Sequence, residues 1–207
     1  MQNTLIAEPV MAVATLPARA VDKTKRHYDP GATSEWYTPG VYLDAARAAM
    51  GGIDLDPASC AHANKTVQAA TYFDRAADGL HRQWFGRVWL NPPYSGEGGK
   101  RVIGFAGKWA TKLLAEYRAG RVEQAVVLVN LSVAYQPAFQ AVARAGVVCM
   151  VDHRIAFISG ATGLPQKGAP QANMLLYLGD RRRQFAAEFG QFGAVLEAVR
   201  DDETERS

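Results

Sequence analysis

Short continuous apolar runs alternate along this chain with longer segments in which apolar residues recur every three or four positions. Continuous runs of this kind are typical of strands that are buried on both faces of a parallel sheet. The recurring apolar residues, such as Phe105, Trp109 and Leu113, are typical of amphipathic helices. The pattern predicts strands at 53–56, 87–91, 124–132, 147–159 and 173–179, and helices at 40–50, 101–120 and 135–146.

Local chain breakers indicate where several of these elements begin and end. Thr38-Pro39 is typical of a helix start, with Thr38 as the N-cap and Pro39 in the first helical position. Gly51-Gly52 is typical of a helix end. The segment 67–73 fits either a short strand or a short helix, and the segment 185–199 has phenylalanines at helical spacing that two glycines interrupt.

Strands that alternate with helices predict an α/β fold with a mostly parallel sheet and helices on both faces. Sheets of this kind bind ligands beyond the carboxyl ends of their strands. The acids Asp54 and Asp56 lie at the end of one predicted strand, and the segment Asn91-Pro92-Pro93-Tyr94 follows another. The carboxyl edge of the sheet is therefore the predicted place of a functional site.

The composition is that of a globular protein of 207 residues, a length that fits one α/β domain. A net charge of +3 permits an anionic partner without requiring one. No apolar run approaches the roughly 18–20 residues that cross a bilayer, so no membrane association is expected. The pattern predicts a flexible arm at 1–33, a single domain at 34–200 and a disordered tail at 201–207.

The two cysteines, Cys60 and Cys149, are far apart and have apolar neighbours. They do not form a disulfide framework, and a reducing cytoplasm is the expected location. The spacings Cys60-x-His62 and Cys149-x3-His153 lack the paired thiolates of zinc sites, so no metal is expected.

The segment Asn91-Pro92-Pro93-Tyr94 combines groups that suit a planar ring with an exocyclic amine. Two prolines make a stiff turn, because each fixes φ near −65°. The Asn91 side-chain carbonyl and the Pro92 backbone carbonyl are then two fixed acceptors, and Tyr94 adds a flat ring beside them. Acceptors on the hydrogens of an aryl amine expose its lone pair to an electrophile, so orientation and electrostatics supply the catalysis. The alternative is that the prolines only end a strand and Tyr94 covers the core.

Five segments, in order, resemble the phage-type DNA N6-adenine methyltransferase (Dam) family, whose members are S-adenosylmethionine-dependent amino-methyltransferases with an Asn-Pro-Pro-Tyr motif. The segments are EWYTP at 35–39, IDLDPAS at 53–59 with Asn64 following, ADGLHRQW at 77–84, VWLNPPYS at 88–95 and DHRIAF at 152–157. The likeness covers about residues 34–178.

The resemblance implies a Rossmann-like class I methyltransferase fold with seven strands, one of them antiparallel near the edge. It implies S-adenosylmethionine as the methyl donor and N6 of adenine in double-stranded DNA as the acceptor. The base would be flipped into a pocket at Asn91-Pro92-Pro93-Tyr94, because a paired and stacked amine is out of reach. The expected location becomes a bacterial or phage-infected host cytoplasm, and the oligomeric state, monomer or dimer, stays open.

The resemblance also assigns roles to single residues. Thr38 and Pro39 would neighbour the methionine part of the cofactor, Asp54 or Asp56 would accept the ribose hydroxyls, and Asp78 would accept the adenine amine. Turn or capping chemistry is the alternative for each of the three acids. The full set expected at the cofactor is Trp36, Tyr37, Thr38, Pro39, Asp54, Asp56, Pro57, Ala58 and Asp78. One departure is the loop 57–61, which lacks the Gly-x-Gly turn of many methyltransferases.

The spacing of these motifs leaves no room for a separate DNA-reading domain. DNA recognition is therefore expected from loops at 95–101 and 159–172, together with the N-terminal arm. A solvated linker is the alternative for the first loop, and pairing with a core acid is the alternative for Arg154. The residues expected at DNA are Ser95, Lys100, Arg101, Arg154 and Lys167.

Two other functions fit the same motifs. One keeps the fold and the donor but methylates cytosine N4 or a protein glutamine amide, which also suit an Asn-Pro-Pro-Tyr site. The other is a non-catalytic DNA-binding module that retains the turn without binding the cofactor.

Overall fold

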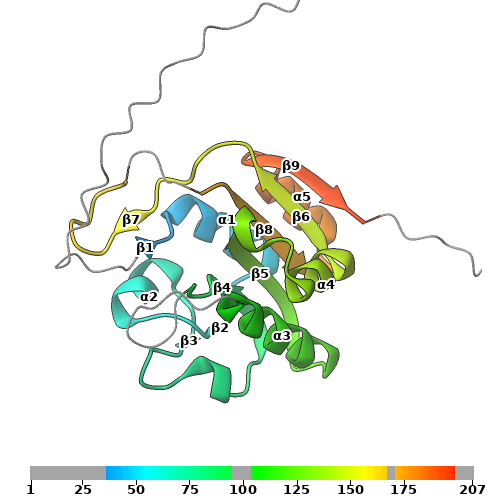
Figure 1. Cartoon of the computed structure of the whole chain (residues 1–207), viewed down its shortest axis with the longest axis horizontal. Coiled ribbons are helices and arrows are strands. Elements are labelled where there is room, and N and C mark those ends of the chain that lie inside the picture. Colours follow the sequence, from blue (N-terminus) through cyan, green and yellow to red (C-terminus); the bar gives the residue numbers. More distant parts are fainter. Residues whose placement is uncertain (1–35, 95–103, 167–170, 199–207) are drawn as a thin grey trace, which may run out of the picture. The chain divides into compact units, whose positions relative to one another are not determined.

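The computed structural model describes residues 36–94, 104–166 and 171–198 (Figure 1). The main sheet has seven strands in the order β3-β2-β4-β5-β8-β6-β9, and β1 and β7 form a separate two-stranded sheet. The strands are β1 (Trp36–Tyr37), β2 (Leu55–Asp56), β3 (Thr71–Tyr72), β4 (Gly86–Leu90), β5 (Val122–Asn130), β6 (Val147–Val151), β7 (Ile158–Ser159), β8 (Asn173–Leu178) and β9 (Gly193–Glu197). The helices are α1 (Gly40–Met50), α2 (Ala61–Val67), α3 (Phe105–Arg118), α4 (Pro137–Ala145) and α5 (Arg182–Phe189), with 3₁₀ turns η1 (Gly79–His81) and η3 (Leu131–Val133).

Four neighbouring strands of the main sheet, β3, β2, β4 and β5, are parallel. Strand β8 is antiparallel to both β5 and β6, so β6 runs in the same direction as β5. The edge strand β9 is antiparallel to β6. The expected mostly parallel sheet of seven strands is present, but it has two antiparallel strands rather than one, because the C-terminal segment adds β9.

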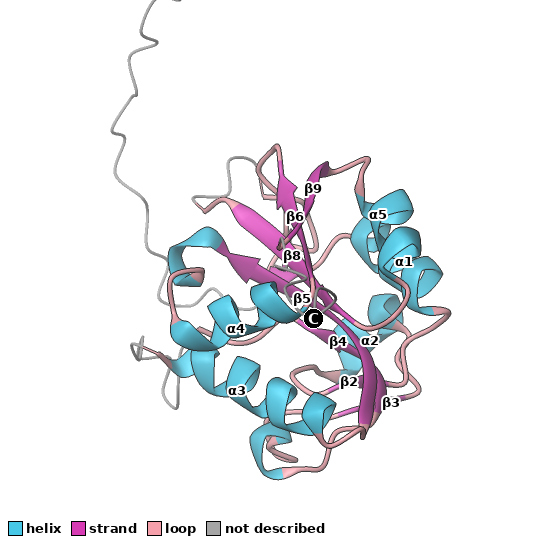
Figure 2. Ribbon diagram, turned by 90° about the vertical axis from the view of Figure 1, so that its right-hand side faces the viewer, coloured by secondary structure: helices cyan, strands magenta, loops and turns pink. Residues whose placement is uncertain are grey.

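Helices cover both faces of the sheet. Figure 2 shows α1, α2 and α5 on one side and α3 and α4 on the other. Alternate residues of the central strand β5 divide between the two layers, as the pleat of a strand requires. Val126 and Leu128 pack with α1 and α5, whereas Val127 and Val129 pack with α3 and α4. This two-sided burial explains why β5 is a continuous apolar run in the sequence.

Most predicted elements are confirmed with shorter bounds. Helix α1 ends at Gly51, which adopts the left-handed conformation expected there (φ 83°). Its N-cap, however, is Pro39, with no side-chain capping bond, and not Thr38. The elements that were not predicted include β1, α2, which Cys60 caps by accepting from the Ala63 N–H, and β9, which follows α5 after the interrupting glycines.

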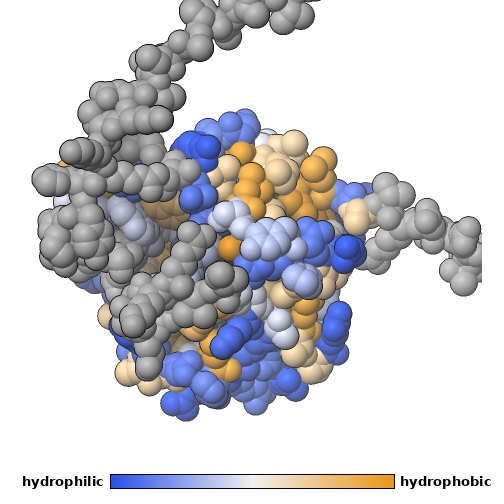
Figure 3. All heavy atoms as spheres, in the orientation of Figure 1, coloured by the Kyte–Doolittle hydropathy of each residue, from blue (hydrophilic) through white to orange (hydrophobic). Residues whose placement is uncertain are grey.

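The expected arm at 1–33 and tail at 201–207 lie outside the described residues. Within the described ranges, no helix is both long and apolar enough to cross a membrane. On the face drawn in Figure 3, hydrophilic residues are interspersed with smaller hydrophobic areas.

Candidate active site at the carboxyl edge of the sheet

Three polar residues mark the carboxyl ends of three adjacent parallel strands. Asp56 is the last residue of β2, Asn91 follows β4, and Asn130 is the last residue of β5. Because β2 pairs with β4 and β4 pairs with β5, these ends meet at one edge of the sheet. The buried residues Val88 and Leu90 fix the end of β4 in the core. The edge predicted from sequence is therefore where the chain concentrates polar groups.

The Asn91 side chain is oriented by Thr38. Its amide nitrogen Nδ2 lies 3.4 Å from the Thr38 hydroxyl oxygen and donates to it. Thr38 is itself 7% exposed and follows β1 directly. With Nδ2 directed at Thr38, the carbonyl oxygen Oδ1 is the acceptor end of the amide, and within the described ranges it receives no hydrogen bond. Thr38 and Asn91, 53 residues apart, are thus brought together as a unit.

Tyr94 is anchored by its hydroxyl at the end of β5. The hydroxyl oxygen accepts a hydrogen bond from the Asn130 N–H at 2.8 Å. Burial raises the pKa of the Tyr94 hydroxyl above its ordinary value. The ring packs against the core layer that contains α3 and α4, although the residue is only partly buried as a whole. Tyr94 therefore both closes the core below the turn and holds the turn against β5.

Burial of the two prolines and a side-chain contact at the end of β5 surround the turn. Pro92 is buried and Pro93 is partly buried. At the end of β5, the Asn130 side-chain oxygen accepts from Nδ2 of Asn173, which is 1% exposed and lies in β8. Two strands therefore hold the residue to which Tyr94 is bonded. Sequence reasoning did not select Asn130 or Asn173, because nothing in a single sequence signals which backbone N–H a distant tyrosine will meet.

Asp56 is a buried carboxylate with spare acceptor capacity. It is 3% exposed, and burial raises its pKa to about 6. One of its oxygens accepts from the Ala58 N–H at 3.1 Å, which partly offsets the effect of burial. A carboxylate has about four acceptor positions, so Asp56 retains positions for the hydroxyls or amine of a ligand.

Asp54, the other candidate acid of this strand, lies at the opposite end. It precedes β2, and its two oxygens accept from Nε and Nη2 of Arg87 at 2.7 and 2.6 Å. The Arg87 N–H also donates to it at 2.8 Å, and these bonds hold the pKa of Asp54 below its ordinary value. Arg87 is near the start of β4, about 13 Å along that strand from Asn91 by strand rise. Of the two acids, only Asp56 lies at the carboxyl edge of the sheet, beside Asn91 and Asn130 in strand order.

Asp78 forms the turn that its sequence favoured. It adopts a left-handed backbone conformation (φ 51°), caps η1 by accepting from the Leu80 N–H at 3.2 Å, and lies 2.6 Å from Nδ1 of His81. The following residue, Gly79, contacts the loop after β2 at Pro57. A Cβ at Gly79 would lie 1.9 Å from the Pro57 carbonyl oxygen, so only glycine permits this approach. The loop after β2 and the turn at 78–79, both expected at the cofactor, are therefore packed together.

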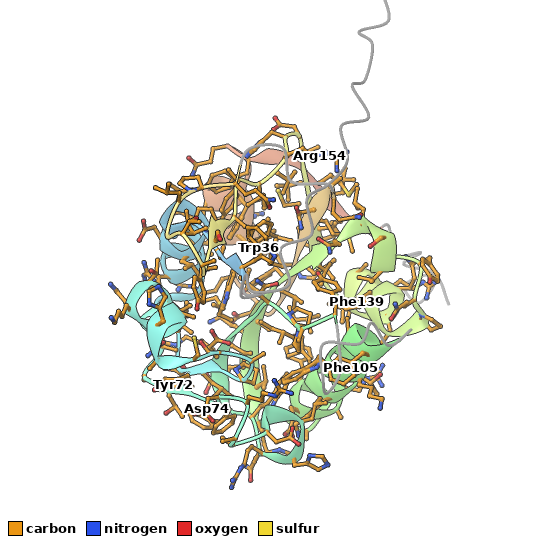
Figure 4. The ribbon with its side chains drawn as sticks, turned by 60° about the vertical axis from the view of Figure 1, so that its left-hand side comes forward. Trp36, Tyr72, Asp74, Phe105, Phe139 and Arg154 are labelled. Carbon is orange, nitrogen blue, oxygen red and sulfur yellow. The ribbon has the colours of Figure 1, made fainter. Side chains whose placement is uncertain are left out.

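The segment 36–39 lies along the two-stranded sheet. Trp36 pairs with Ser159 and is 42% exposed, and Tyr37 pairs with Ile158. The Tyr37 ring lies 4.7 Å from that of His62 by centroids. In Figure 4, Trp36 and Arg154 lie in the upper half of the view, while Tyr72 and Asp74 lie at the lower left. Trp36 is therefore a surface residue of β1, whereas Thr38 reaches Asn91.

The remaining expected residues differ in what the structure says of them. Pro39 and Ala58 are partly buried and Pro57 is buried, beside Thr38 and Asp56 respectively. Among the residues expected at DNA, Arg154 is exposed in the loop after β6.

The positions Ser95, Lys100, Arg101 and Lys167 lie outside the described residues.

Near Arg154, the preceding His153 is held on both sides. Its Nε2 lies 2.6 Å from the Tyr42 hydroxyl, and its Nδ1 lies 2.7 Å from Asp152. Burial and the Asp152 charge raise the pKa of Tyr42. The loop that carries Arg154 is thus fastened to α1.

Asp74 is a further acid near the carboxyl edge of the sheet that the sequence analysis did not select. It follows β3, the strand next to β2, and is exposed, with one oxygen accepting from the Ala77 N–H at 2.8 Å. The sequence left the segment 67–73 open between a strand and a helix, so the end of β3 just before Asp74 was not predicted.

Neither cysteine belongs to a metal site in the described part of the chain, where no group of three potential metal ligands occurs. Cys60 caps α2 through its sulfur, 3.4 Å from the Ala63 nitrogen. Cys149 is buried in β6, and burial raises the pKa of its thiol to about 11.

Taken together, the fold and the edge define an α/β protein with an oriented amide, a stiff Pro-Pro turn and a buried carboxylate at adjacent strand ends. The family model described as DNA N-6-adenine-methyltransferase (Dam) matches residues 27–204. The chain belongs to this family. A search of curated proteins gave no match.

Proposed function

We propose that this protein is an S-adenosylmethionine-dependent DNA methyltransferase that acts on N6 of adenine. Family membership supports methylation of DNA adenine in general terms. The observation that carries the proposal to this chain is the contact between Nδ2 of Asn91 and the hydroxyl of Thr38. It supports a defined amide orientation, in which Oδ1 is the group that meets the target amine.

The proposed chemistry needs acceptors in fixed positions. Oδ1 of Asn91 and the carbonyl of Pro92 accept the two hydrogens of the adenine amine. The nitrogen lone pair, otherwise delocalised into the ring, is then available for the new N–C bond. As that bond formed, the bond between the donor sulfur and the methyl group would break, and the surplus amine proton would pass to water. Because the turn is held by Tyr94 at β5 and by Thr38 at β1, these acceptors need little reorganisation during the reaction. Asn91 binds and orients the amine and is not a base.

The residues at the edge fit the cofactor. When bound, S-adenosylmethionine supplies an electrophilic methyl group. Asp56 suits its ribose hydroxyls, since a buried carboxylate with open acceptor positions forms short charge-assisted hydrogen bonds. The loop from Pro57 to Cys60 has small side chains in place of the Gly-x-Gly turn, and Gly79 packs against its carbonyl. We propose the class I methyltransferase fold on the same grounds, supported by β8 lying antiparallel between β5 and β6.

The adenine is proposed to leave the DNA duplex. Extrusion of a base costs a few kcal/mol, and stacking on an aromatic ring offsets about 1–3 kcal/mol of it. Tyr94 supplies the ring in this proposal. Its hydroxyl is anchored at β5, and the residue as a whole is only partly buried, which supports this role.

A methyl-transfer assay tests the proposal. Radiolabelled methyl transfer to unmethylated duplex DNA should occur with the wild-type chain and fall by about 10²–10³ in Asn91→Ala, the range for loss of one preorganised polar group. The exposed amide variant Gln184→Ala on α5 is the matched control and should retain activity. Asn91→Ala should keep the wild-type melting temperature and cofactor affinity.

The chemical identity of the methylated nucleoside shows which base accepted the methyl group. A nucleoside digest resolved by mass should contain N6-methyladenine. A digest with only N4-methylcytosine, or transfer that survives in Asn91→Ala, would contradict the proposal. Absence of both cofactor binding and transfer in the wild-type chain would favour a non-catalytic DNA-binding module.

A further inference from the structure

A pocket lies between the start of α3 and the turn that joins η3 to α4. Its volume is about 390 Å³, and it is open to solvent. None of the residues expected at the cofactor or at the target base lines it. The lining residues are Gly104, Gly107, Lys108, Thr111, Tyr135, Gln136, Pro137 and Ala138.

The charge of this pocket is positive. Lys108 is exposed and, among the described residues that line the pocket, it is the one that carries a charge. Its ammonium lies 5.9 Å from the centre of the Phe105 ring, a cation–π arrangement that keeps the group near the start of α3. An anion in the pocket would therefore meet a cation, and no carboxylate opposes it among the lining residues that the structure describes.

The other polar groups can donate hydrogen bonds, since a tyrosine hydroxyl and a glutamine amide each carry donor hydrogens as well as an acceptor oxygen. Tyr135 is 72% exposed, so its hydroxyl is accessible. The Gln136 side-chain amide makes no hydrogen bond within the described residues, and a Cβ at Gly107 would lie 2.7 Å from its Oε1. The absence of a side chain at Gly107 thus makes room for Gln136. Thr111 donates to the Gly107 carbonyl at 3.0 Å and serves the helix.

The remaining lining is apolar and suits a sugar. Pro137 and Ala138 are apolar lining residues, and Tyr135, also in the lining, carries an aromatic ring. A cation with neutral donors beside apolar wall atoms matches a phosphodiester with its deoxyribose. The volume agrees, since it lies at the small end of ligand pockets, which range from about 300 to 1,000 Å³.

The position connects this pocket to the proposed active site. Turn η3 begins immediately after Asn130, whose N–H donates to Tyr94. Tyr135 follows five residues later in the chain. The pocket is therefore carried by the same strand end that anchors the ring proposed to stack on the flipped base.

We propose that this pocket binds a phosphate of the DNA backbone near the flipped nucleotide, with Lys108 as the charged contact and Gln136 and Tyr135 as neutral donors. The inference rests on the proposed function, because it takes DNA as the substrate. Phosphate contacts of this kind fix the register of a protein on DNA without reading sequence. A nucleotide that is to be extruded requires its flanking backbone to be held.

Two substitutions test the pocket from opposite directions. Lys108→Gln removes the cation. Gln136→Glu keeps the shape of the side chain and adds an anion, and its position at the N-terminus of α4 favours a negative charge, so the fold should persist. The control is Arg118→Gln, an exposed cation at the other end of α3, about 15 Å from Lys108 by helix rise.

Binding of a fluorescent duplex is measured against salt concentration by anisotropy, with cofactor affinity measured in parallel. Lys108→Gln should weaken DNA binding by about 3- to 10-fold near 0.1 M salt and lower the slope of log K against log salt by about one, with similar losses for different sequences. Gln136→Glu should weaken binding at least as much. Arg118→Gln and the cofactor affinities should match the wild type.

The outcomes separate this inference from the proposed function. If the wild type binds and methylates DNA but Lys108→Gln and Gln136→Glu retain its affinity and salt slope, the pocket does not bind the backbone. If the losses in Arg118→Gln equal those in Lys108→Gln, the effect is one of overall charge and the inference fails. If the wild type transfers no methyl group to DNA yet both pocket variants weaken DNA binding, the proposed reaction fails while the phosphate site stands.

Discussion

The Tyr94 hydroxyl accepts the backbone N–H of Asn130 at 2.8 Å, so the turn that follows β4 is tied to the end of β5. Asn130 is in turn held by Asn173 of β8. A residue whose ring is proposed to stack on a base is therefore fixed by its far end. The stiffness of the site comes from this tie as well as from the two prolines.

The first prediction concerns this tie. Tyr94→Phe keeps the ring but leaves the Asn130 N–H without its partner, which should lower the free energy of unfolding by about 1–3 kcal/mol. Methyl transfer should fall less than in Tyr94→Ala, which also removes the ring. Thermal unfolding and transfer rates check both. Tyr117→Phe is the control, because the Tyr117 hydroxyl makes no hydrogen bond within the described residues; an equal loss of stability there would contradict the explanation.

The second prediction concerns Thr38. If its hydroxyl orients the Asn91 amide, Thr38→Val should lower kcat by roughly tenfold, equivalent to about 1.4 kcal/mol, with little change in KM for the cofactor. Thr38→Ser should restore most of the rate. A steady-state comparison of the three chains provides the measurement. A rise in KM for S-adenosylmethionine at constant kcat would instead assign Thr38 to cofactor binding.

The third prediction follows from the raised pKa of Asp56. The folded state holds its proton up to about pH 6, whereas the ordinary pKa is 3.8. Burial of the ionised form therefore opposes folding above pH 6, and this opposition disappears as the pH falls below 3.8. Asp56→Asn removes the charge at constant shape, so it should stabilise the ligand-free protein at neutral pH by up to about 3 kcal/mol.

Thermal unfolding of wild type and Asp56→Asn at several pH values checks this sign. The stabilisation should be full above about pH 6 and should shrink toward zero near pH 4. The same variant should bind S-adenosylmethionine more weakly, because the amide is a poorer acceptor for hydroxyls. The gain in stability of Asp56→Asn over the wild type is the quantity to compare. If this gain is no larger at neutral pH than at acid pH, Asp56 is not buried as an ionised group.

The fourth prediction concerns the contact between the loop after β2, at Pro57, and the turn at 78–79. Gly79→Ala would place a Cβ 1.9 Å from the Pro57 carbonyl oxygen, so the two segments must separate. The free energy of unfolding should fall by about 3 kcal/mol, at the upper end of the range for overpacking. Cofactor binding should also become weaker. The same substitution at Gly40, where a Cβ would meet its nearest atoms at 3.8 Å, should be harmless. Calorimetric titration with the cofactor and thermal unfolding compare the two variants.

Elements that depend on local interactions could be predicted from the sequence, whereas those that depend on long-range pairing could not. The apolar run of β5 and the glycine that ends α1 were predictable, since both follow from local patterning and backbone preference. The segment 185–199 was not, because its glycines serve a helix end and then an edge strand that exists only by pairing with β6. For the same reason the number of antiparallel strands was predicted as one and is two.

The sequence by itself determined the α/β class, the place of Asn91 to Tyr94 after a buried strand, and the family resemblance, because periodicity and motif spacing are local properties. Only the tertiary structure decided that Thr38 contacts Asn91 instead of capping a helix and that Tyr94 is bonded to Asn130. It likewise decided that Asp54 pairs with Arg87, while Asp56 lies at the carboxyl edge of the sheet. Those relationships join residues between 33 and 53 positions apart. They arise when the strands align in register, a choice made by the packing of the whole sheet and not by any one segment.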